Sequence, residues 1–395
     1  MPPPTPLAVE ILERLVAFDT VSSRSNLALI RWVAEYLSGY GIDSRLSHDE
    51  SGAKANLFAT IGPRDRGGVV LSGHTDVVPV TGQAWDSDPF RLTARDGRLY
   101  GRGTADMKGF IALALALVPK AMAAPLATPL HLAFSYDEEI GCLGAPVLLR
   151  DLPRGAARPV LAIIGEPTSM QIADAQKGCH FHRTRVTGLE GHASAPERGV
   201  NAITTAAEII AAIGRLGAEA RGRARPQTGF DPPYTTFNVG TIRGGTAINI
   251  IPRACEFEWD LRPLPGEDGA ALKGQIDRFV EAELLPRLRA VYPDAAVQTE
   301  TIVAVPPLVP DPHSPALSLS RRLTGANGTT TVSFASEAGL YQQAGIPAVL
   351  CGPGSIAVAH QPNEFIALDQ LAAGEAFLDR LLGWARRPPG IGSGL

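Results

Sequence analysis

The sequence predicts an α/β fold in which a mostly parallel sheet forms one domain and an inserted α+β segment forms a second. Three observations carry this prediction. Short, continuous apolar runs at residues 69–71, 129–135 and 159–164 are typical of strands buried on both faces. An apolar helical stretch at 107–123 gives the strand–helix–strand order of a parallel sheet. From residue 177 the pattern changes to an alternation typical of antiparallel strands.

The first domain is expected to begin with two amphipathic helices, at residues 7–18 and 26–40, the second ending before Gly41. Strands and turns follow at 44–61, ahead of the first buried strand, and a short helix is expected at 141–150. The α/β pattern returns late in the chain, with a helix at 314–323, strands at 331–334 and 347–350, and a helix at 368–386.

The inserted segment is expected to form an α+β unit of its own. Its elements are a strand at 180–187, a helix at 201–216, strands at 235–242, 247–251 and 254–261, and a helix at 266–288. Residues 1–176 and 292–395 are therefore expected to form one discontinuous domain, with 177–291 inserted into it. The Pro- and Gly-rich stretch 387–395 is expected to fray.

The composition indicates a globular protein with a large core. Of 395 residues, 45% are hydrophobic and 19% are charged, with a net charge of −4 and no stripe of Lys and Arg, which argues against nucleic acid as a partner. The first residues do not follow the secretory signal pattern, and the longest apolar stretch, 110–118, is too short to span a bilayer. We expect a cytoplasmic protein without a membrane partner.

The four cysteines are scattered, which is typical of free thiols in a reducing compartment. Cys142 lies near a pair of acidic residues. A reactive thiol is one interpretation of this position, but an ordinary small buried side chain is favoured.

Acid and imidazole side chains follow the apolar runs where each predicted strand ends. They are His74 and Asp76, Glu138 and Glu139, Glu166, and the late His360, with Asp106 opening a long helix. Because the carboxyl ends of parallel strands meet at one edge of a sheet, these side chains are expected to lie close together. Imidazole and carboxylate are ligands of zinc and related metals, so the pattern predicts a metal site and favours two metals.

Each position also has an ordinary interpretation. A solvated turn explains His74, an N-cap explains Asp106, and an exposed acidic turn explains the pair Glu138 and Glu139. The pair is the sharper signal, since adjacent acids repel one another unless a cation offsets them. Neighbouring residues of an extended chain point to opposite sides, so one acid is free to bind a metal while the other acts as a general base.

Five motifs, taken together and in order, resemble the di-zinc aminoacylase/carboxypeptidase family of metallopeptidases. They are Ser-Gly-His-Thr-Asp-Val-Val-Pro at 72–79, the glycine-rich segment 101–109, Asp-Glu-Glu at 137–139, Gly-Glu-Pro-Thr at 165–168, and His360. The resemblance covers essentially the whole chain, the inserted segment included. It implies a metal-dependent amide hydrolase with two Zn²⁺ ions per chain, with Co²⁺ or Mn²⁺ as alternatives.

The resemblance also implies a role for each residue. The implied metal ligands are His74 and Glu166 for one ion, Glu139 and His360 for the other, and Asp106 as a bridge between the two. Asp76 would hold His74, and Glu138 would be the general base. A cis peptide is implied after the bridging residue, at Asp106–Met107.

The inserted segment resembles the family's lid and dimerisation domain. His192, in Gly-His-Ala-Ser-Ala-Pro, matches a histidine that reaches the active site of a partner subunit and stabilises an oxyanion, which implies a homodimer. Asn249 and Arg262 match positions that handle substrate, and Arg262 suits a bidentate grip on a carboxylate. Without the resemblance, a solvated histidine and a surface ion pair are the simpler interpretations.

The segment 332–340 resembles the acetylornithine deacetylase subgroup, in which a Glu-Ala pair stands at this place. An acid at Glu337 suits a cationic side chain in the substrate. The resemblance therefore implies deacetylation of N2-acetyl-L-ornithine in arginine biosynthesis. The alternative is a related N-acyl-amino-acid hydrolase, such as succinyl-diaminopimelate desuccinylase.

Overall fold

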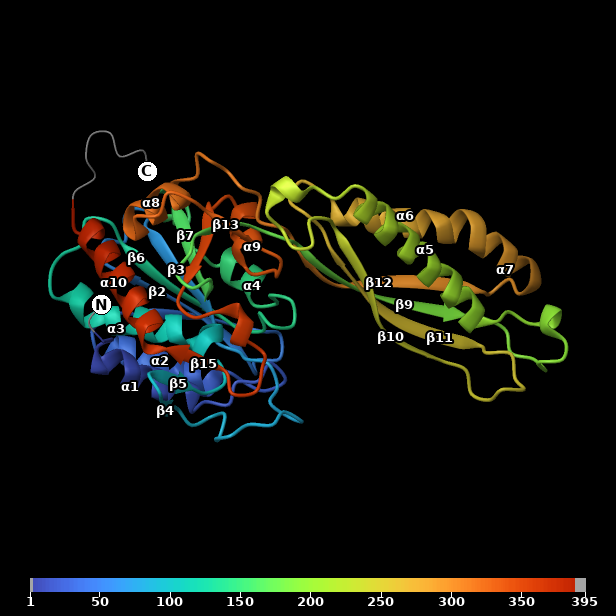
Figure 1. The fold of residues 1–395 in the computed structure, drawn as a ribbon, viewed down its shortest axis with the longest axis horizontal. Helices are drawn as coiled ribbons and strands as arrows, with labels where there is room; N and C mark the ends of the chain where they lie inside the picture. The colour runs from blue at the N-terminus through green and yellow to red at the C-terminus, as the bar shows by residue number, and fades with distance from the viewer. Residues whose placement is uncertain (1–2, 388–395) are drawn as a thin grey trace. The chain divides into compact units, whose positions relative to one another are not determined.

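The computed structural model describes residues 3–387, and these form two compact units (Figure 1). The first unit contains residues 3–175, 310–330 and 336–387, and the second contains 176–309 and 331–335. The predicted frayed tail falls mostly on residues 388–395, outside the described residues. Within 3–387, no helix combines the length and the apolar character that crossing a membrane requires.

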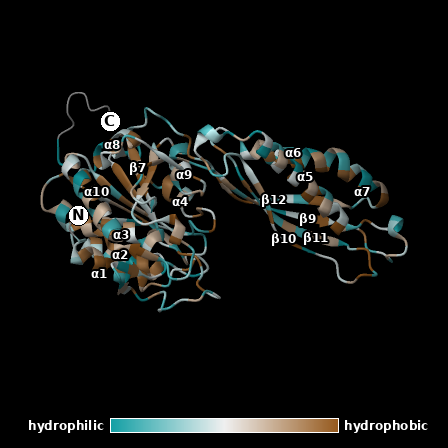
Figure 2. Ribbon diagram, viewed as in Figure 1, coloured by the Kyte–Doolittle hydropathy of each residue, from teal (hydrophilic) through white to brown (hydrophobic). Residues whose placement is uncertain are grey.

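An eight-stranded sheet organises the first unit. Its strand order is β1 (Ser44–His48), β2 (Ala55–Ile61), β6 (Leu130–Ser135), β3 (Val69–His74), β7 (Leu161–Pro167), β14 (Ala348–Gly352), β8 (Ala173–Gln176) and β13 (Thr330–Val332). The central strands β6, β3, β7 and β14 run parallel, and the β1 and β2 pairings are antiparallel. Every residue of these four strands is buried, and β7 is coloured as hydrophobic in Figure 2. The predicted α/β class is confirmed.

Helices cover this sheet. They are α1 (Pro6–Val16), α2 (Leu27–Ser38), α3 (Gly109–Met122), α4 (Ala145–Arg150), α8 (Pro315–Thr324), α9 (Ala338–Gln343) and α10 (Leu368–Ala385). The most apolar of them, α3, contacts β2, β3 and β7, while α1 and α10 pack against α3. Because α3 is covered on both sides it is buried almost throughout, which explains its nearly uninterrupted apolar sequence.

A small second sheet of the first unit was not predicted. It consists of β15 (Phe365–Ala367), β5 (Arg98–Tyr100) and β4 (Thr93–Arg95), with antiparallel pairing. Three-residue strands are too short to show a period-two alternation, so the sequence carries no pattern for them.

The second unit is a four-stranded antiparallel sheet with helices. The strand order is β10 (Thr236–Gly244), β11 (Ala254–Arg262), β9 (Cys179–Thr187) and β12 (Ala296–Val305), and the helices are α5 (Ala202–Gly222), α6 (Gly269–Phe279) and α7 (Leu285–Val291). The core joins Phe257 and Trp259 of β11 to Ile209 and Ile213 of α5.

The second unit differs from the prediction in two respects. The insertion was expected to end at residue 291, but it continues to Val309, because β12 pairs with β9 along its whole length. The strand expected at 247–251 is a turn closed by a single bridge at Ile250, and β11 pairs with β10 directly. Only Val303 and Val305 of the ten residues of β12 are buried, and the polar residues 298–301 interrupt its apolar pattern, so it lacks the continuous apolar run that marks a buried strand.

Candidate metal centre

The parallel strands deliver acids and imidazoles to one edge of the first unit's sheet. His74 is the last residue of β3, the Glu138–Glu139 pair follows β6, and Glu166 lies at the end of β7. Since β6, β3 and β7 are adjacent, their carboxyl ends lie together. Asp106 comes from the turn Thr104–Lys108 that precedes α3.

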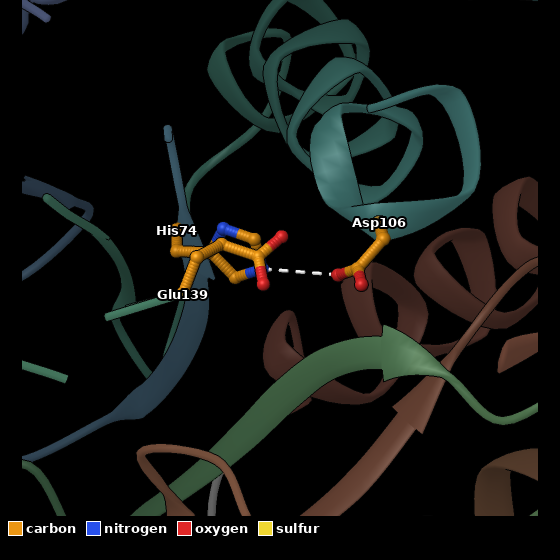
Figure 3. A group of neighbouring side chains, drawn as sticks. All are labelled: His74, Asp106 and Glu139. Atoms are coloured by element: carbon orange, nitrogen blue, oxygen red, sulfur yellow. Dashed lines mark hydrogen bonds and ion pairs between the residues drawn. The ribbon is translucent and has the colours of Figure 1, made fainter. Parts of the chain in front are cut away.

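Asp106 lies between two histidines. Its Oδ1 is 3.0 Å from His74 Nε2, and its Oδ2 is 3.3 Å from His360 Nε2. His360 Nε2 is also 3.0 Å from Glu139 Oε2, and His74 Nε2 is 4.0 Å from Glu166 Oε1. Figure 3 shows Asp106 directed at His74, with Glu139 beside that imidazole. Each carboxylate oxygen of Asp106 therefore faces a different histidine, as a bridging ligand requires.

Two overlapping groups of ligand atoms have metal-binding geometry. In one, His74, Asp106 and Glu139 each offer an atom within 4.8 Å of the other two, and in the other His74, Glu138 and Glu166 do so. Both groups contain imidazole nitrogen and carboxylate oxygen, a donor set that zinc, cobalt and manganese accept.

The acids of this cluster are hard to ionise together. Burial raises the pKa of Glu138 well above its ordinary value, and the charges of Glu166 and Glu139 raise it further against the opposing effect of His74. Burial and the charge of Asp106 likewise raise the pKa of Glu166 well above its usual range, and that of Glu139 to about 7. Without a cation, the cluster therefore retains protons near neutral pH.

The two histidines are tuned in the opposite direction. Hydrogen bonds to Asp106 and Glu139 raise the pKa of His360 to about 10. Burial opposes the charge on His74, but hydrogen bonds to Asp106 and Asp76 raise its pKa well above the usual value. Burial would raise the pKa of Asp106, yet the two histidines hold it well below its usual range.

Asp76 organises the site from behind. His74 Nδ1 lies 2.9 Å from the backbone carbonyl of Asp76 and 3.6 Å from its carboxylate. That carboxylate accepts hydrogen bonds from the backbone N–H of Glu138 at 3.0 Å and of Glu139 at 3.3 Å, and from Ser22 Oγ at 2.6 Å. Asp76 thus fixes the imidazole and the acidic pair at once, a wider role than the one predicted.

Known proteins support a metal-dependent chemistry for this cluster. Residues 70–383 match the sequence profile of peptidase family M20/M25/M40. The chain belongs to this family. The M20 assignment and the cluster make the protein a metal-dependent hydrolase, and the resemblance inferred from the five motifs is confirmed.

Two curated relatives are similar along nearly their whole length. The acetylornithine deacetylase of Pasteurella multocida is 35% identical over 386 residues, which cover 96% of this chain and 98% of that protein. The acetylornithine deacetylase of Proteus mirabilis is 37% identical over 372 residues, covering 91% and 92%.

Solved M20 structures share the fold. A metallo-carboxypeptidase from Sulfolobus solfataricus has a TM-score of 0.73 at 17% identity, covering 96% of this chain and 99% of that one. The di-peptidase Dug1p from Saccharomyces cerevisiae has a TM-score of 0.72 at 17% identity, covering 98% and 97%. At this level of identity the likeness concerns the fold alone.

The cluster fits the divalent metals of an M20 hydrolase on its own evidence. Glu166 is 4% exposed, and its Oε1 has no hydrogen-bond partner among residues 3–387. A buried carboxylate oxygen without a partner is costly, and a cation would satisfy it. The peptide Asp106–Met107 is cis, as the motif implied.

Glu337 occupies a different environment from the one expected. It is 1% exposed, and its Oε2 accepts a hydrogen bond from Ser72 Oγ at 3.0 Å. Ser72 Oγ also lies 3.1 Å from the hydroxyl of Tyr341, a residue of α9. Burial raises the pKa of Glu337. Since the carboxyl is enclosed between β3 and α9, it contacts protein groups and offers no open face to a substrate in this conformation.

Cys142 is buried beside the acidic pair. Its thiol lies 3.4 Å from Glu138 Oε1, and burial followed by the charge of Glu138 raises the thiol pKa well above its ordinary value. A thiol held protonated is a poor nucleophile, so its environment favours the ordinary interpretation of this cysteine.

The predicted residues of the second unit fall into two groups. His192 and Asn249 are exposed and adjacent: His192 forms a bridge with Ile250, and the N–H of Ala193 donates to the carbonyl of Asn249 at 3.1 Å. Both lie in loops beyond the Ala254 end of β11. Arg262 is the last residue of that nine-residue strand, with its Nε 3.3 Å from Asp260 and its guanidinium over Phe181.

A strand rises about 3.3 Å per residue, so nine residues place Arg262 roughly 26 Å from the other end of β11. The structure therefore brings His192 and Asn249 together and separates both from Arg262. This separation was not visible in the sequence, because it depends on which strand each residue joins.

Several residues that hold the centre in place were missed. Buried Arg102 and Glu364, with partly exposed Gln83, form a hydrogen-bond network that reaches Asp106 and His360. Arg102 lies within the glycine-rich motif and Glu364 lies four residues after His360. The sequence around them has no pattern that marks either as part of the site. An Arg and a Glu that are both 1% exposed are recognisable only once the fold is known.

Proposed function

We propose that the protein hydrolyses N2-acetyl-L-ornithine to ornithine and acetate with two Zn²⁺ ions, supplying ornithine for arginine synthesis in the cytoplasm. One observation carries the reaction class: Asp106 directs one carboxylate oxygen at each of two histidines, inside a buried cluster in which the pKa values of the three glutamates are raised. The substrate is supported by the two relatives of that activity, which align with more than nine-tenths of the chain.

The proposed ligand roles are those that the family resemblance implies, and the short distances from Asp106 to His74 and His360 support them. His74 and Glu166 would hold one ion, Glu139 and His360 the other, and Asp106 would bridge them. When bound, two such ions lower the pKa of water and polarise the scissile carbonyl. Co²⁺ and Mn²⁺ are the alternative occupants of the same donor set.

Glu138 would act as the general base. It belongs to the cluster without contacting either histidine as a hydrogen-bond partner, and burial raises its pKa, which favours uptake of a proton. It would take a proton from the attacking water and deliver it to the nitrogen of the leaving amine. Asp76 supports this role, because it holds the backbone N–H of Glu138.

The second unit would complete the site as a lid and dimerisation domain, with His192 and Asn249 contributed by a second subunit. The separation of roughly 26 Å along β11 supports this arrangement, since a small substrate cannot contact Arg262 and His192 of one rigid sheet. Arg262 would grip the α-carboxylate, and His192 would stabilise the oxyanion. The sheet edge β10 is exposed over most of its length, which suits it to an interface between copies.

A cytoplasmic enzyme is supported by the cysteines. All four are buried, as is usual for thiols in a reducing compartment. Among residues 3–387 the structure thus gives no sign of the disulfide framework of a secreted domain.

The test is release of free amine from N2-acetyl-L-ornithine by the purified protein, before and after chelation and again after Zn²⁺ is restored. Fast release that chelation abolishes and zinc restores is expected, at a rate well above that from N-succinyl-diaminopimelate. A faster reaction with another N-acyl amino acid would keep the chemistry and replace the substrate. Absence of hydrolysis despite bound metal would exclude the proposal.

A further inference from the structure

We propose that Glu364, Arg102 and Gln83 form a single brace that positions Asp106 and His360. The brace would thereby set the affinity for the ion assigned to Glu139 and His360, which is called the second ion below. This inference rests on the metal centre of the proposed function. It concerns three residues whose hydrogen bonds reach the backbone of the ligands Asp106 and His360.

The brace begins where two loops leave one short ladder. Tyr100 of β5 pairs with Phe365 of β15, and the N–H of Gly101 donates to the carbonyl of Glu364 at 3.0 Å. The loop that carries Asp106 therefore starts beside the loop that carries His360. Two proposed ligands that are distant in sequence are therefore connected by this pair of strands and by the side chains described next.

Glu364 fixes the backbone of the Asp106 loop. Its Oε1 accepts hydrogen bonds from the N–H of Ala105 at 2.9 Å and of Asp106 at 3.1 Å, and its Oε2 accepts from the N–H of Gly103 at 3.0 Å. Arg102 Nη1 donates to the same Oε2 at 2.7 Å. The carboxylate is 1% exposed and receives four donors, so both oxygens are occupied and the turn has little freedom to move.

Arg102 carries the connection to the second loop. Its Nη2 donates to Gln83 Oε1 at 2.6 Å, and Gln83 Nε2 donates to the carbonyl of His360 at 2.8 Å. Trp85 holds both side chains in place, because its indole N–H donates to Gln83 Oε1 at 3.1 Å and the centre of its ring lies 5.1 Å from the guanidinium carbon of Arg102. An unbroken path of hydrogen bonds thus runs from the N–H of Asp106 to the carbonyl of His360.

His360 depends on this path more than Asp106 does. Its side chain is 51% exposed, against 6% for Asp106, so packing alone does little to hold it. Its backbone has a φ of 63°, in the left-handed region that a histidine seldom adopts. A conformation of this kind persists only when neighbouring groups determine it, and the Gln83 bond to the His360 carbonyl is such a group.

A buried ion pair does not by itself indicate a function, because replacing it with apolar groups is often neutral for stability. The distinguishing feature here is that both ends of the brace terminate on backbone groups of metal ligands. Partners of this kind typically change metal affinity by about 10–100-fold when they are removed. A merely structural pair would lower the melting temperature and leave the ratio of the two metal affinities unchanged.

The test is calorimetric titration of the full-length apoprotein with Zn²⁺, alone and in three variants. Gln83→Glu keeps the acceptor for Arg102 but removes the donor to His360, and Glu364→Gln keeps the shape of the side chain but removes its charge. Glu375→Gln is the matched control, since it removes the charge of a glutamate that pairs with Lys120 in the same unit and takes no part in the hydrogen bonds of the brace.

The wild type and Glu375→Gln are expected to show two binding steps with the same affinities. Gln83→Glu is expected to weaken the second step by about 10–100-fold and leave the first step unchanged. Glu364→Gln is expected to weaken both steps, the second more strongly, because Asp106 serves both ions. Gln83 lies in a partly exposed loop, so its variant is expected to fold even if Glu364→Gln does not.

Unchanged affinities in Gln83→Glu would overturn the inference. If the wild type still binds two ions and hydrolyses its substrate in a chelator-sensitive way, the proposed function survives that result. Absence of two binding steps in the wild type would instead remove the proposed function, and the brace with it.

Discussion

The two units differ in what they bury and what they expose. Among residues 3–387, every fully buried carboxylate belongs to the first unit, whereas the buried polar side chains of the second unit are uncharged or, for Lys177, donate to two backbone carbonyls. The predicted functional residues of the first unit are mostly enclosed, and His192 and Asn249 of the second are exposed.

This difference indicates that the two units need different additions before they can contribute to a reaction. The first unit contains a set of carboxylates that repel one another and is completed by cations. The second unit has an ordinary apolar core, and its loops expose His192 and Asn249, which the proposed function assigns to the site of a second subunit. Removal of the cations should therefore lower the stability of the first unit. Loss of a partner subunit should abolish the contribution of the second unit to activity.

The largest expected effect comes from the proposed general base, Glu138. Glu138→Gln should lower kcat by about 10²–10⁴-fold, because the side chain can no longer take a proton, while metal content remains that of the wild type. Steady-state kinetics and metal analysis on the same preparation check this. Retention of wild-type turnover would remove Glu138 from the mechanism, and Glu375→Gln provides the unaffected control.

The second unit's contribution is tested by mixing subunits. His192→Ala alone should lower kcat by about 10²–10³-fold, because an oxyanion donor is lost. Hybrids of Glu138→Gln chains with His192→Ala chains should regain activity, since one of the two sites in each hybrid then has both residues intact. No recovery on mixing would show that His192 acts within its own chain or not at all.

Metal binding should stabilise the two units unequally. Zinc at a hundredfold excess over its dissociation constant contributes about 2.7 kcal/mol to the folded state, and this should act on the strands that end at the cluster. Hydrogen exchange measured by mass spectrometry should slow in peptides from β3, β6 and β7 and remain unchanged in β9 and β11. Equal protection of both units would contradict the claim that the metal ions act on the first unit alone.

The smallest effect concerns acid stability of the second unit. Burial lowers the pKa of His182 to about 4, and this ring packs on Trp259 with centroids 4.3 Å apart. The unfolded chain takes up a proton near pH 6.5, while the folded one does not until about pH 4. Stability present above pH 6.5 is therefore lost as the pH falls toward 4.

His182→Phe should reduce that loss, seen as slower hydrogen exchange in β9 peptides at pH 5 relative to the wild type. His131 of the first unit offers the matched comparison, because burial also lowers its pKa to about 4 and it stacks on Phe58. His131→Phe should protect β6 and leave β9 unchanged. A uniform response of both units would show that the acid effect is not local.

Much of the first unit was predictable, because its strands are long and continuously apolar. The rule that parallel strands deliver their carboxyl ends to one edge is enough, with the sequence alone, to group His74, Glu139 and Glu166. The sequence could not show that Glu337 and Tyr341 meet Ser72 of β3 in the interior, since their burial depends on how α9 packs over β7 and β14. Nor could it show the brace, which depends on two three-residue strands without a pattern.

The second unit was harder for a related reason. The strand β12 is interrupted by the polar residues 298–301 and has only two buried positions, so the insertion was predicted to end too early, at residue 291 instead of Val309. The distance between His192 and Arg262 was likewise hidden, because it is set by the length of β11. Residue type identified the candidates, and strand pairing determined which of them can act together.

The central claim is that two metal ions share Asp106 between His74 and His360. It is tested most directly by counting tightly bound zinc per chain in the wild type and in His360→Ala. The account predicts about two ions in the wild type and about one in His360→Ala, because His74, Asp106 and Glu166 remain to hold the first ion. Equal zinc content in the two proteins, or none in the wild type, would contradict it.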